Sequence, residues 1–62
     1  MWTDIMFRTL RVMSLTPRMS VEQGRLAMLE YESRGELECA VVVLKAQGYR
    51  VEDLGNALEV RV

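Results

Sequence analysis

The most constraining feature of this chain is a change of hydrophobic period at Gly48. Between Leu37 and Leu44 the apolar residues recur at the spacing of one helix face. After Gly48, apolar and polar residues alternate, with a break at Gly55 and Asn56. Alternation is typical of half-buried strands, and such a glycine–asparagine pair suits a tight hairpin turn. The pattern predicts a helix over 36–47 and a β-hairpin with strands over 49–54 and 57–62.

The predicted helix has signals at both of its ends. Ser33 and Glu36 form the S-x-x-E pattern of a capping box, and Gly48 suits the position just after a helix. An apolar run with valines at 41–43 argues the other way, because β-branched side chains lose rotamer freedom in helices. A strand over 37–44 is therefore the alternative, and the end signals favour the helix.

The predicted hairpin has one apolar surface. A two-residue turn and a four-residue loop give the same register, in which Val51 faces Val60. Every second residue then falls on the same surface, and Asp53 is its only polar member. The apolar members of that surface are Tyr49, Val51, Leu58, Val60 and Val62. We expect the helices to cover this surface, because its opposite carries four charged side chains.

The first half of the chain is harder to assign. Ser20 and Gln23 form a second capping box, and apolar residues follow at helical spacing, so we predict a helix over 20–33. Gly24 costs such a helix about 1 kcal/mol relative to alanine. Residues 1–13 fit a helix, a strand or a weakly ordered segment, and a third strand over 5–12 would support the hairpin. The predicted fold is a single two-layer α+β domain over 1–62, with the helical pair 20–33 and 36–47 packed on the hairpin.

Size and composition limit the chemistry of the chain. At 62 residues, burial of apolar surface barely offsets the cost of ordering the chain. Cys39 is the only cysteine and histidine is absent, which excludes an internal disulfide, a zinc cluster and nucleophile–histidine catalysis. We expect Cys39 to be a small buried side chain. We also expect no enzymatic activity, no cofactor and no metal.

The same observations predict an interaction module. Half of the residues are apolar, and the C-terminal strand ends without a covering segment, so pairing with another chain is expected. A homodimer would solve the size problem. No apolar run reaches the ~18 residues of a membrane span, no signal peptide is visible, and chains of this size are common among phage and mobile-element accessory proteins. We therefore predict a cytoplasmic protein whose interface contains Val42, Val43, Leu58, Val60 and Val62.

A small DNA-binding regulator is the alternative. Two helices followed by a hairpin resemble the element order of a winged helix-turn-helix, although no sequence motif supports the resemblance. The net charge of −1 provides no strong field for nucleic acid, and the helix over 36–47 lacks the polar outer face that reads a groove. Under this alternative, phosphates would be contacted by Arg8, Arg11, Arg18, Arg25 and Arg34.

Overall fold

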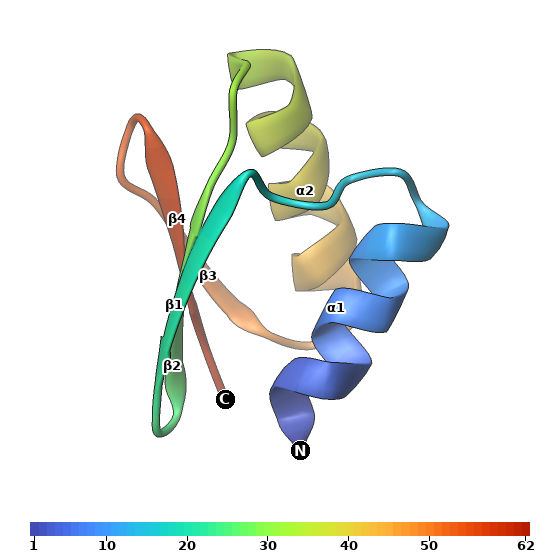
Figure 1. Ribbon diagram of the computed structural model, residues 1–62, viewed down its shortest axis with the longest axis vertical. Coiled ribbons are helices and arrows are strands. Elements are labelled where there is room, and N and C mark those ends of the chain that lie inside the picture. The colour runs from blue at the N-terminus through green and yellow to red at the C-terminus, as the bar shows by residue number, and fades with distance from the viewer.

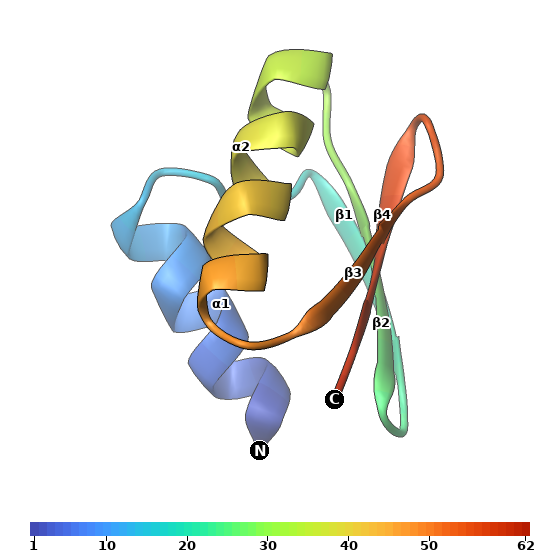
Figure 2. The ribbon, with the colours of Figure 1, turned by 180° about the vertical axis from the view of Figure 1, so that it is seen from behind.

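Two helices pack on one face of a four-stranded antiparallel sheet in the computed structural model, which covers residues 1–62 (Figure 1). Along the chain the elements are α1 (Trp2–Val12), β1 (Met19–Gln23), β2 (Leu26–Glu30), α2 (Arg34–Ala46), β3 (Arg50–Asp53) and β4 (Ala57–Arg61). The strand order is β1-β2-β4-β3, so two hairpins join side by side through β2 and β4. Figure 2 shows the opposite face of the sheet free of helices. The predicted two-layer α+β class is confirmed.

The C-terminal half follows the sequence pattern. The side chain of Ser33 caps α2 by accepting a hydrogen bond from the backbone N–H of Glu36 at 3.2 Å. The helix continues to Ala46, and the chain then enters β3. In the second hairpin Val51 pairs with Val60, as predicted. The helix over 36–47, the hairpin and its register are confirmed, and a strand over 37–44 is excluded.

Residues 20–33 form most of the β1–β2 hairpin and the connector that ends at Ser33, the cap of α2, so the predicted helix over this range is wrong. Gly24 is the first central residue of the turn between the strands and has a φ of 61°, a value that glycine adopts without strain. Burial in β2 alternates: Ala27 and Leu29 are fully buried, whereas Met28 between them is partly exposed. Pairing of β2 with β4, far along the chain, overrides the local helical spacing.

Residues 2–12 form α1, so the possible third strand over 5–12 is wrong and the helical alternative for this segment is correct. Met6 and Leu10 lie one helical turn apart, and both are fully buried. Trp2 joins α1 to the rest of the molecule: its indole N–H donates to the carbonyl of Gly24 at 3.1 Å, and its ring lies 5.9 Å from that of Tyr49. The support that the C-terminal hairpin requires comes from β2. Whether residues 1–13 are weakly ordered in solution stays a prediction.

The core lies between the sheet and the two helices. Its fully buried large side chains come from both helices, β2 and β4: Met6, Leu10, Leu29, Leu37, Leu44, Leu58 and Val60. Tyr31 closes the core near the connector after α1, where its hydroxyl donates to the carbonyl of Leu15. Burial, with a smaller contribution from the nearby Glu36 carboxylate, raises the pKa of Tyr31 to about 12. The hydroxyl therefore stays a proton donor at neutral pH.

Candidate functional site

The strand that ends the chain has no free edge. β4 pairs with β2 on one side and with β3 on the other, so the free edges of the sheet are β1 and β3. The prediction that the Leu58–Val62 strand offers an open edge is therefore wrong. A pairing between two hairpins that are adjacent in space but separated in sequence has placed β4 in the middle of the sheet.

The residues predicted to form the interface are dispersed in the structure. Leu58 and Val60 are completely buried under the helices, so in this fold neither is available to a partner. Val43 is partly buried and packs against the core. Val42, on the outer side of α2, is 69% exposed, and Val62 is 44% exposed. An interface role for these two side chains stays a prediction.

Strand β1 is exposed along its whole length. Met19 and Val21, on the sheet face away from the helices, are 56% and 63% exposed. Ser20 and Glu22 pair with Leu29 and Ala27, whose side chains are buried against the helices, so they lie on the helix side. Proline, lysine and arginine, which protect many natural edge strands, are absent from β1.

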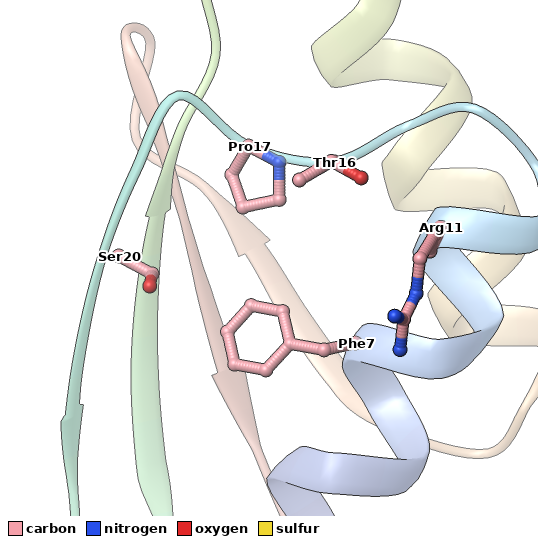
Figure 3. A pocket seen from close by; sticks show the side chains of 5 residues that line it. All are labelled: Phe7, Arg11, Thr16, Pro17 and Ser20. Atoms are coloured by element: carbon pink, nitrogen blue, oxygen red, sulfur yellow. The ribbon is translucent and has the colours of Figure 1, made fainter.

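The helix side of this edge opens into a cleft between α1 and β1 (Figure 3). Its volume is about 370 Å³, and its lining consists of Phe7, Arg11, Thr16, Pro17 and Ser20. The Phe7 ring reaches from α1 toward the strands, and Arg11 lies one turn further along the same helix. Arg11 forms no ion pair within the chain. A guanidinium and two hydroxyls beside an aromatic ring suit a carboxylate that carries an apolar neighbour.

The opposite side of the same edge is apolar. A smaller hollow of about 130 Å³ lies on the outer face of the sheet. Met19, Val21, Met28 and Ala57 contribute to its lining. The exposed backbone of β1 therefore has a place for side chains on both of its faces, which is the requirement of a strand that pairs with it.

The second free edge is surrounded by charge. The guanidinium of Arg34 binds the Asp53 carboxylate at 3.0 Å and Glu38 at 3.1 Å. The hydrogen bond from Arg34, helped by the backbone N–H of Gly55, holds the pKa of Asp53 below its usual value. The same carboxylate raises the pKa of Arg34. Further along the outer face, Arg50 and Glu52 lie beside the Arg61–Glu59 ion pair, which is 2.9 Å long.

The arginines of the DNA-binding alternative do not gather on one surface. Arg8 and Arg11 belong to α1, while Arg18 is paired with Glu30 at 3.3 Å. Arg25 lies in the β1–β2 turn and Arg34 begins α2, and Figure 1 shows these two segments at opposite ends of the molecule. The structure thus favours no phosphate-binding surface that includes the whole set.

Comparison with known proteins found no matching family model, curated protein or solved structure. Neither helix has the length and apolar character needed to cross a membrane. No cluster of three or more acidic or cysteine side chains is placed to hold a metal ion.

Cys39 is exposed, so the expectation that it is buried is wrong. It lies on the outer side of α2, away from the apolar stripe that begins at Leu37.

Sequence reasoning missed the β1 edge and its cleft because it placed these residues in other elements. Phe7 lies in the segment for which helix, strand and weak order all fit the sequence, and Val21 lies in the helix predicted over 20–33. One signal was present: Met19–Gln23 precedes a Gly-Arg pair, and a glycine followed by another residue is a standard two-residue hairpin turn.

Proposed function

We propose that this protein is a non-catalytic interaction module that binds another polypeptide by adding a strand to β1. The observation that carries the proposal is an exposed edge strand that contains no proline, lysine or arginine and a single charged residue. In strand addition, backbone hydrogen bonds supply affinity, and pockets for alternate side chains supply specificity. The cleft on the helix side and the apolar hollow on the outer side support this mode of binding.

The proposal includes the homodimer that the sequence predicts, because an edge of this kind serves a second copy as well as another protein. It also includes a cytoplasmic location and a role of the kind that small accessory proteins of phages and mobile elements fulfil. The single cysteine, which has no disulfide partner within the chain, supports that location.

The test is a charge placed on the free edge. Val21→Lys puts an ammonium group on the outer side of β1, where an added strand would have to cover it. We expect this variant to lose its bound polypeptides, whether copies of itself or host proteins captured from the native source. The matched control is Glu52→Lys on β3, which should leave binding intact. Because both side chains are exposed, folding should change by no more than about 0.5 kcal/mol.

Sedimentation velocity and affinity capture read out binding, and thermal unfolding verifies that both variants remain folded. If the Val21→Lys protein folds and retains every association of the wild type, strand addition at β1 is not how this protein binds.

A further inference from the structure

We propose that the strand added to β1 is β1 of a second copy, in antiparallel orientation. The two-fold axis then passes between the two Val21 residues, and Glu22 of each copy lies in the Phe7–Arg11 cleft of the other. This inference rests on the proposed function and deepens it by naming the partner. It follows from three properties of β1: the direction of its free backbone groups, the side chains on its two faces, and the charge in the cleft.

The backbone fixes which residues pair. The turn after β1 closes on Gln23 and Leu26, and opposed residues alternate between pairs with and without hydrogen bonds. The N–H and C=O groups of Ser20 and Glu22 therefore point away from β2. In a register centred on Val21, Ser20 lies opposite Glu22 of the second copy, and each outward donor meets an outward acceptor.

The side chains agree with this register. Residues directly opposite each other in a sheet lie on the same face. Val21 then meets Val21 of the second copy on the outer face, and Met19 meets Gln23. The apolar hollow around Met28 continues across the axis. No like charges lie directly opposite each other, and the two helical layers fall on the same side of the extended sheet.

Charge identifies a second copy as the occupant. Glu22 makes no ion pair within its own chain, and neither does Arg11. In the proposed pairing, the Glu22 carboxylate of the second copy enters beside Ser20, which lines the cleft together with Arg11. An unpaired carboxylate on β1 thus meets an unpaired guanidinium next to β1, twice in each dimer, as the two-fold axis requires.

The experiment exchanges the two charges. Glu22→Arg and Arg11→Glu should each weaken self-association at least about tenfold, because like charges then face each other twice across the axis. An equimolar mixture of the two variants should associate again, since both contacts in the mixed dimer join opposite charges. The double variant should dimerise for the same reason. Arg8→Glu, on the exposed side of α1, is the matched control and should dimerise like the wild type.

A cross-link tests the register. In a Cys39→Ser background, Val21→Cys should form a disulfide-linked dimer, because two copies of residue 21 lie directly opposite each other at the axis. Gln23→Cys should not, because its counterpart lies at the far end of the paired strands. Oxidation followed by non-reducing electrophoresis distinguishes the two.

Three results would overturn the inference. They are a wild-type protein that stays monomeric up to about 100 µM, a dimer indifferent to both charge reversals, and a dimer that cross-links through residue 23 in place of residue 21. None of them overturns strand addition at β1, which fails only if the Val21→Lys protein keeps all its associations. A monomeric wild type that loses host partners on Val21→Lys would mean that strand addition is correct and self-pairing wrong.

Discussion

The two free edges of the sheet, β1 and β3, differ in how readily another strand can pair with them. β3 is four residues long and three of them are charged, and Arg34 holds its last carboxylate. β1 is five residues long and only Glu22 is charged, while Met19 and Val21 expose apolar surface. Short, charged edges discourage strand pairing and long, uncharged ones invite it. We therefore expect another strand to pair with β1, the open edge, and not with β3, the closed edge.

The largest expected effect is on stability and comes from β4, one of the two central strands of the sheet. Leu58 of β4 is completely buried beneath the helices. Leu58→Ala should destabilise the fold by about 2–5 kcal/mol, because it removes buried methyl groups and leaves a cavity. Urea unfolding followed by circular dichroism measures this. Leu54→Ala, at a position that is 45% exposed, is the control and should cost far less. Equal losses would mean that the two hairpins do not share one core.

The two hairpin turns provide the next comparison. Gly24 has a φ of 61° and Gly55 a φ of 100°, and a Cβ at either position would meet no atom within 4 Å. The cost of alanine is therefore backbone strain alone. Gly24→Ala should cost about 1 kcal/mol, and Gly55→Ala should cost more, because φ near 100° lies outside the left-handed region that other residues tolerate. Thermal unfolding of both variants gives the order, and the reverse order would contradict these backbone angles.

Acid should weaken the closed edge at β3. The pKa of Asp53 is lowered in the folded state, chiefly by the hydrogen bond from Arg34. Its contribution to stability is therefore present above its unfolded pKa of about 3.9 and is lost as pH falls through the lower folded value. The melting temperature of the wild type should drop between pH 5 and about pH 2 more than that of Asp53→Asn. Asp4→Asn, which retains Asp53, is the control. Parallel pH profiles for wild type and Asp53→Asn would exclude this contribution.

The smallest effect on stability, and the largest on binding, comes from adding charge to the β1 edge and removing charge from the β3 edge. Glu52→Val makes the β3 edge more apolar, and Val21→Lys makes the β1 edge charged. Each should change the free energy of unfolding by no more than about 0.5 kcal/mol, because both side chains are exposed. Sedimentation should show a loss of self-association for Val21→Lys and a gain for Glu52→Val. If Val21→Lys still self-associates and Glu52→Val does not, the edges do not differ as their residues indicate.

The two hairpins also show where sequence reasoning succeeds. For β3–β4, the strict alternation on both sides of Gly55 indicates a hairpin, and the predicted pairing of Val51 with Val60 is confirmed. For β1–β2, Ser20 and Gln23 match the capping box of a helix N-terminus. The apolar residues after Gly24 fit the helical spacing as well as the alternation of a strand. The site fared worse than the fold, because Phe7 and Ser20 come together only when α1 lies over the first hairpin.

The sequence by itself determined α2, the second hairpin with its register, and the absence of the histidine and second cysteine that much site chemistry needs. Those features depend on residues within a few positions of one another. The tertiary structure alone decided that β4 lies inside the sheet, that residues 19–30 are strands, and that β1 is the open edge. The reason is the β2–β4 ladder: its hydrogen bonds join segments on either side of α2, so no local pattern records them.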